Sequence, residues 1–130
     1  MARYLTQEWF DQFLELSADQ PVRPGASARI QYVAEGTPEG DVRYHWVVED
    51  GKLLEAALGD IPDADFTLKM DYAVAQKVQK GQLDPSAAFM QGLMKVTGNM
   101  AKMMALLPVT QSPEYRAFQD RVRAVTEYAE

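Results

Sequence analysis

The spacing of apolar and polar residues predicts a helix near the start of the chain. Thr6 is a suitable N-cap, and the apolar residues that follow it recur at helical spacing, with polar residues on the opposite side. These apolar positions are Trp9, Phe10, Phe13, Leu14 and Leu16. We expect this amphipathic helix to end before Pro21, because proline disfavours helical geometry in the residue before it.

From residue 28 onward apolar and polar residues alternate, which is the period of a β-strand. Asp50-Gly51 interrupts the alternation with a residue pair that favours a type I′ hairpin turn, since both residues tolerate positive φ. A second break, at 59–63, precedes a further alternating run. We therefore predict strands at 28–35, 42–49, 52–54 and 66–70.

After residue 70 the helical period returns, with one short strand among the helices. Asp71 can cap a helix that ends at Gly81, and Asp84-Pro85 combines an acidic cap with a proline at the first helical position. The expected elements are a helix at 71–81, a helix at 84–92, a strand at 93–97, a helix at 99–108 and a helix from 112 onward.

The order of these elements predicts an α+β fold. We expect a five-stranded, mainly antiparallel sheet with the helices gathered on one face. A chain of 130 residues has the size of one domain, and no internal repeat or linker is visible, so residues 1–130 are expected to form a single domain. The pattern leaves open whether sheet and helices meet tightly or around a hollow.

Charge narrows the range of partners. The chain carries thirteen basic and nineteen acidic residues, which gives a formal net charge of −6. Such a charge opposes phosphate backbones and anionic lipid surfaces, so nucleic acid is not expected as a partner. No apolar stretch reaches the roughly 18 residues that a membrane span needs, and we expect no stable membrane insertion.

The sequence offers few residues for catalysis or metal binding. Cysteine is absent, and the lone histidine, His45, leaves no imidazole pair for zinc. His45 is interpreted as an ordinary solvated strand residue. The acidic cluster Asp60, Asp63 and Asp65 lacks the glycine and distal glutamate of a calcium loop. We therefore expect no enzyme activity, no catalytic residue, no metal and no cofactor.

Methionine is the unusual feature, because five of the seven methionines fall between Met90 and Met104. Met100, Met103, Met104 and Leu107 follow the i, i+3, i+4, i+7 spacing of one helical stripe. Methionine adapts to irregular or changing apolar shapes, so this stripe suits either a cavity for flexible ligands or a plain core with gaps to fill. Composition alone leaves both interpretations open.

A motif in this region points to a known family. A helix led by aspartate ends in Lys80-Gly81, and residues 84–100 read D-P-S-A-A-F-M-Q-G-L-M-K-V-T-G-N-M. Within that run, Gly92, Lys95 and Gly98-Asn99 fit the pattern Gly-x-x-Lys-x-x-Gly-Asn/Asp. With these features the chain resembles the sterol carrier protein type 2 (SCP-2-like) family of lipid-binding domains.

The resemblance implies a five-stranded sheet whose helices enclose an apolar tunnel for sterols, fatty acids, acyl-CoA or phospholipids, without catalysis. The methionine stripe then becomes an adaptable lining, and adjacent Met103 and Met104 are both expected to border the hollow. The residues expected to contact lipid are Trp46, Leu68, Val78, Phe89, Met90, Met100, Met103, Met104 and Leu107.

Several expectations remain beside this one. The chain ends in Tyr128-Ala129-Glu130 and not in a Ser-Lys-Leu-type address, so we expect a cytoplasmic protein. The last helix either caps the tunnel or contacts a second copy in a homodimer. The alternative function is an accessory or dimerisation domain, with a shallow or filled cavity, that acts beside an enzyme on another chain.

Overall fold

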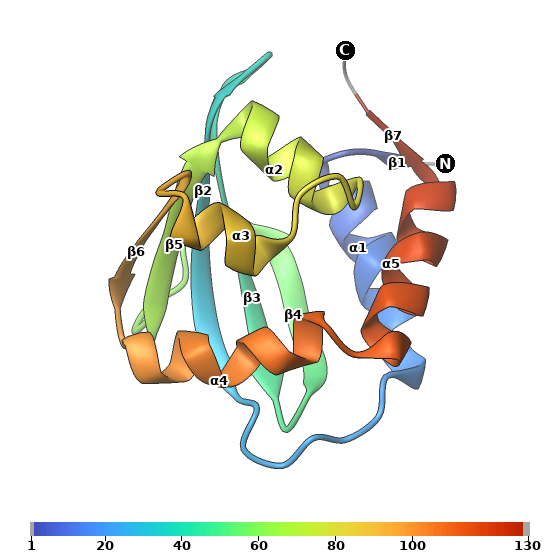
Figure 1. Ribbon diagram of the computed structural model, residues 1–130. Coiled ribbons are helices and arrows are strands. Elements are labelled where there is room, and N and C mark those ends of the chain that lie inside the picture. The colour runs from blue at the N-terminus through green and yellow to red at the C-terminus, as the bar shows by residue number, and fades with distance from the viewer. Residues whose placement is uncertain (1, 129–130) are drawn as a thin grey trace.

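A five-stranded sheet forms the central layer of the protein, whose computed structural model describes residues 2–128 (Figure 1). The spatial order of the strands is β4-β3-β2-β5-β6. Neighbouring strands are antiparallel except for the parallel pair β2–β5, which confirms the expected mainly antiparallel sheet. The strands are β2 (Ala28–Thr37), β3 (Gly40–Glu49), β4 (Lys52–Leu58), β5 (Phe66–Asp71) and β6 (Met94–Gly98).

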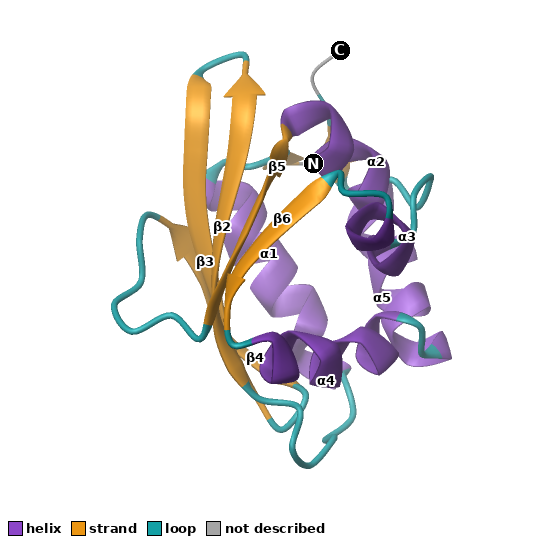
Figure 2. Ribbon diagram, turned by 60° about the vertical axis from the view of Figure 1, so that its left-hand side comes forward, coloured by secondary structure: helices purple, strands orange, loops and turns teal. Residues whose placement is uncertain are grey.

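The helices lie on one face of this sheet, as Figure 2 shows, and the α+β fold class is confirmed. Four of the five α-helices are capped by a side chain that accepts a backbone N–H, which satisfies one of the free donors at each N-terminus. The helices are α1 (Gln7–Leu16), the 3₁₀ helix η1 (Ser17–Asp19), α2 (Tyr72–Gln79), α3 (Pro85–Met90), α4 (Met100–Thr110) and α5 (Pro113–Ala124).

Two glycines act where other residues would be strained. Asp50 and Gly51 have φ of 49° and 81°, as the predicted hairpin turn between β3 and β4 requires. Gly98 ends β6 with φ of 111°, and a Cβ there would lie 2.6 Å from the backbone oxygen of Asp65. Glycine at 98 therefore lets β6 approach β5 before the chain turns into α4.

The structure differs from the sequence prediction at Pro108. Helix α4 runs through this proline to Thr110 instead of ending at it. The ring removes only one N–H, and the last turn continues through hydrogen bonds from Gln111 N to Pro108 O and from Ser112 N to Val109 O, each 3.2 Å. The Thr110 hydroxyl adds a 2.7 Å bond to Leu107 O.

A second, two-stranded sheet was not predicted. It pairs β1 (Ala2–Arg3) with β7 (Thr126–Glu127) in parallel, so the two ends of the described chain lie side by side (Figure 1). Strands of two residues carry no detectable period, which explains why the pattern does not reveal them.

The core consists of two clusters of buried apolar residues. One gathers aromatic side chains of α1, β3 and α5, among them Trp9, Phe13 and Phe118. The other gathers side chains of β2, β5, β6 and the helices α2 to α4, among them Phe66 and Met103. Tyr32 packs against both clusters, and a cavity lined by residues of both lies between them.

Candidate functional site

A cavity of about 500 Å³ lies between the helix-covered face of the sheet and the helices. Its size falls within the range of small-molecule sites, and its wall is mainly apolar. The strands β2, β3, β5 and β6 form the floor through side chains that alternate inward. These floor residues are Ile30, Tyr32, Tyr44, Trp46, Phe66, Leu68, Met70 and Met94.

The remaining walls come from all five α-helices, with Trp9 as the contribution of α1, and from Tyr4 near the start of the chain. Ala75 and Val78 belong to α2, and Phe89 belongs to α3. The other helical side chains are Met103, Leu106 and Leu107 of α4 and Tyr115 of α5. A smaller hollow of about 110 Å³ shares Tyr32, Trp46 and Leu106 with the cavity, so the apolar space extends towards α1.

The aromatic part of the wall is uncharged at neutral pH. Burial raises the pKa of the Tyr4, Tyr32 and Tyr44 phenols above the ordinary value, and burial raises the pKa of Tyr115 to about 12. The indole Nε1 of Trp46 is buried without a hydrogen-bond partner among residues 2–128. The wall therefore combines apolar surface with the unused donor of Trp46.

Polar residues gather at one border of the cavity, where the loop before α3 faces α5. Asp84, Arg116 and Asp120 belong to this border. Arg123 forms an ion pair with Asp120 and donates a 3.4 Å hydrogen bond to the Gln79 carbonyl oxygen. The exposed guanidinium of Arg116 has no ion pair or hydrogen bond in the described part of the chain, so it is available to an anionic group.

The structure brings six of the nine sequence-predicted lipid contacts together in the cavity wall. They are Trp46, Leu68, Val78, Phe89, Met103 and Leu107. The other three point elsewhere, since Met90, Met100 and Met104 expose 80%, 41% and 54% of their surface. Met104 follows Met103 at an angle of about 100° around the helix, which is enough to turn it out of the cavity.

Sequence reasoning missed most of the floor. Ile30, Tyr32 and Tyr44 lie on inward-facing positions of the predicted strands, so the alternation already contained this signal. No sequence pattern could identify Arg116 as a cavity residue, because its position at the cavity border depends on how α5 packs against the sheet.

His45 differs from the expected solvated residue. It is buried, its Nδ1 lies 2.9 Å from the Gly59 carbonyl oxygen, and its Nε2 lies 3.4 Å from a carboxylate oxygen of Glu55. The loop after β4 covers it, and it does not line the cavity. Within residues 2–128 no group of three or more histidine or acidic side chains could hold a metal ion.

Comparison with known proteins gives a family match. The SCP-2 sterol transfer family matches residues 10–111, which is more than three quarters of the chain. No curated protein matches the sequence. A crystal structure of sterol carrier protein 2 superimposes with a TM-score of 0.69 at 21% identity, covering 93% of this chain and 98% of that one.

Two further structures show the same fold in different settings. Palmitated SCP2L2 from Aedes aegypti gives a TM-score of 0.60 at 14% identity, with 81% of this chain and 89% of that chain covered. The sec-alkylsulfatase Pisa1 from a Pseudomonas species gives a TM-score of 0.54 at 20% identity, with 80% of this chain but only 16% of the sulfatase covered.

None of the described helices is long and apolar enough to cross a membrane.

Proposed function

The chain belongs to the SCP-2 sterol transfer family, and on this premise we propose that it binds one long-chain lipid, with the apolar tail in the cavity described above. The observation that carries the proposal is the volume of about 500 Å³ bounded by apolar side chains of sheet and helices. A tail placed there gains mainly from removal of its surface from water, at about 25 cal/mol per Å². The cavity and its extension towards α1 are then the tunnel of this domain.

Within the lipids, a fatty acid or an acyl-CoA fits the site best. The free guanidinium of Arg116 at the border of the cavity can meet a carboxylate or a phosphate, whereas a sterol has only a hydroxyl to offer. The comparison with palmitated SCP2L2 agrees with an acyl ligand. The six cavity residues predicted from the sequence are the expected contacts of the tail.

In this proposal the chain is a single, cytoplasmic, non-catalytic lipid-binding domain, with storage or transfer of the ligand as its action. The accessory-domain alternative requires a shallow or filled cavity and is not favoured. The fold also occurs as a small part of Pisa1, so the same domain can exist beside catalytic machinery in a longer chain.

The test is native mass spectrometry of freshly purified protein, followed by organic extraction. We expect a bound long-chain amphiphile at about one per chain, or rapid loading of the empty protein with added fatty acid. A protein that is empty and takes up neither fatty acid nor acyl-CoA nor sterol would contradict the proposal.

A further inference from the structure

Three polar side chains form a chain of hydrogen bonds within the mainly apolar wall of the cavity. Gln79, the last residue of α2, donates from Nε2 to the Gln119 side-chain oxygen at 2.6 Å. Gln119 in turn donates from Nε2 to the Tyr115 hydroxyl oxygen at 2.7 Å. All three residues line the cavity, where α5 lies beside the end of α2 (Figure 1). Because a buried amide is costly unless it is hydrogen-bonded, these bonds hold the Tyr115 hydroxyl in place.

The Tyr115 hydroxyl retains a proton that it can donate. Its oxygen accepts from Gln119, whereas its O–H meets no acceptor among residues 2–128. Burial raises the pKa of this phenol to about 12, so the proton is present at neutral pH. Tyr115 therefore offers the cavity a donor, while its acceptor capacity is partly used.

A second phenol without a hydrogen bond belongs to the floor of the cavity. Tyr32 of β2 lines the cavity, and its hydroxyl has no partner within the described chain. Tyr32 and Tyr115 also border the smaller hollow together. Burial, followed by the neighbouring phenols of Tyr44 and Tyr115, raises the pKa of Tyr32, so this hydroxyl also keeps its proton. We call Tyr32 and Tyr115 the phenol pair.

We propose that the phenol pair binds the carbonyl oxygen of an acyl ligand. The inference rests on the proposed function and adds the chemical group by which the cavity distinguishes acyl chains from other apolar ligands. A carbonyl oxygen has two lone pairs and no proton, so it can accept from both phenols. A sterol hydroxyl would bring a proton of its own, and the Tyr115 oxygen is already bonded to Gln119. Gln79 and Gln119 are positioning residues in this arrangement.

The phenol pair and Arg116 recognise different parts of the ligand. Arg116 is exposed at the border of the cavity and suits a charged group. The uncharged phenols suit a carbonyl, which a fatty acid, an ester and a thioester all contain. A methyl ester has the carbonyl without the charge, so its binding tests the phenol pair apart from Arg116.

The experiment compares methyl palmitate with hexadecane, which has a similar chain but no carbonyl. Each ligand is titrated into the full chain and into the variants Tyr32→Phe and Tyr115→Phe. These substitutions remove one hydroxyl each and keep the ring. The fluorescence of Trp9 and Trp46 reports binding, because both tryptophans line the cavity.

Tyr72→Phe is the matched control. The Tyr72 hydroxyl accepts from Nε2 of Gln76 at 3.0 Å, which repeats the i, i+4 arrangement of Tyr115 and Gln119 on another helix. Tyr72 does not line the cavity. Its substitution therefore removes the same group from the same local setting, away from the ligand.

We expect Tyr32→Phe and Tyr115→Phe each to weaken methyl palmitate binding by about three- to tenfold, as the loss of one hydrogen bond predicts. Hexadecane binding should change by less than about twofold, and Tyr72→Phe should alter neither ligand. Equal losses for both ligands would assign the phenols a packing role and overturn the inference.

Unchanged methyl palmitate binding in either variant would also overturn the inference, since water and not the ligand would then satisfy that hydroxyl. In both of these cases the wild type still binds lipid, so the proposed function stands. A wild type that binds neither of these ligands nor palmitic acid would contradict the proposed function and the inference together.

Discussion

At the residue scale, Met103 and Met104 show how closely spaced side chains separate into two environments. Met103 is 5% exposed and lines the cavity, whereas Met104 is 54% exposed. The sequence predicted a methionine-rich wall but could not assign its orientation, because apolar residues surround most of helix α4. Only packing against the sheet decides which methionines face inward.

The pair gives a matched test of the cavity. Met103→Trp should fill space in the cavity and weaken long-chain fatty acid binding by about tenfold or more, while the free energy of unfolding changes little because a hollow accepts the added volume. Met104→Trp should leave both unchanged. The measurements are a fatty-acid titration and a thermal unfolding curve for each variant.

A tightly packed site would give the opposite result. Overpacking a filled core costs about 1–3 kcal/mol, so Met103→Trp would then unfold at a clearly lower temperature with unchanged titration. That outcome would contradict the cavity as a ligand site.

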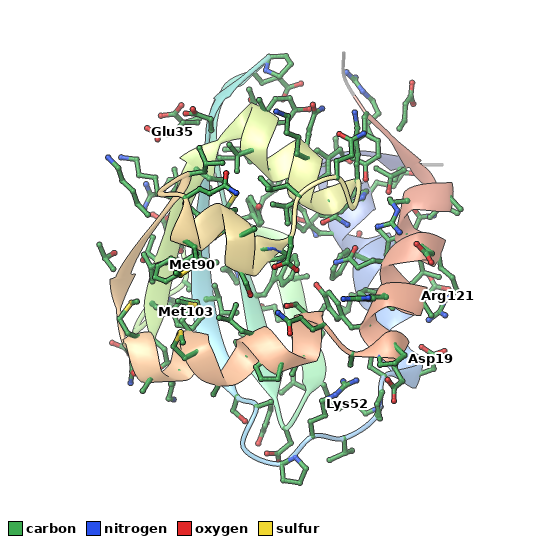
Figure 3. The ribbon with its side chains drawn as sticks, viewed as in Figure 1. Asp19, Glu35, Lys52, Met90, Met103 and Arg121 are labelled. Carbon is green, nitrogen blue, oxygen red and sulfur yellow. The ribbon has the colours of Figure 1, made fainter. Side chains whose placement is uncertain are left out.

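Substitution of Arg116 tests whether its guanidinium binds the carboxylate of a fatty acid. Arg116→Ala should weaken binding of a fatty acid about two- to fivefold, as expected for an exposed ion pair, and leave binding of the fatty alcohol of equal chain length unchanged. Arg121→Ala is the control, since Arg121 lies on the same helix but pairs with Asp19 at 3.0 Å and does not line the cavity (Figure 3). Equal losses for acid and alcohol would assign Arg116 a structural role only.

At the element scale, the junction of β5, β6 and α4 holds the helix that covers the cavity. The Asp65 carboxylate accepts a 2.7 Å hydrogen bond from the Arg29 backbone N–H, and its second oxygen lies 3.2 Å from Lys102. The Asp65 carbonyl accepts from Asn99 N at 2.7 Å, and the Asn99 side chain caps α4. This one residue therefore connects the sheet to the start of α4.

The pKa of Asp65 gives a pH-dependent prediction. The Arg29 backbone hydrogen bond, with help from Lys102, lowers the pKa of this carboxyl below its ordinary value of 3.8. Its contribution to stability is therefore present above pH 3.8 and is lost as the pH falls through the lowered value. Asp65→Asn should cost about 1 kcal/mol at neutral pH, and the difference from wild type should shrink in acid.

Denaturant unfolding at several pH values checks this prediction. Asp63→Asn is the control, because Asp63 is exposed in the preceding turn and its loss should stay within about 0.5 kcal/mol. A cost for Asp65→Asn that is equally large well below pH 3.8 would rule out the ionised carboxylate as the stabilising group.

The elements themselves were largely predictable from local chemistry. The predicted N-caps Thr6 and Asp84 accept backbone N–H groups, and the Asp50-Gly51 turn has the expected positive φ. The third predicted cap, Asp71, precedes α2 as expected but forms no side-chain cap bond. Pro108 was misjudged, because a proline near the end of a helix removes a single bond that the next turn replaces.

At the scale of the whole molecule, the cavity follows from how the sheet is ordered. Strand β5 pairs with β2 in parallel, which places β5 and β6 beside the first hairpin and separates two core clusters. The strands were predicted from alternation, but their spatial order was not, since it depends on contacts between distant segments. The volume between the clusters could be expected only through the family resemblance.

The most direct test of lipid binding in this cavity is a displacement series with saturated fatty acids of increasing length. A fluorescent fatty acid bound at about one per chain is displaced by each acid in turn. If tails lie in the cavity, the binding free energy improves by up to about 0.8 kcal/mol per added methylene until the space is filled, and then levels off. Displacement that is independent of chain length, or no binding of the probe, would contradict the account.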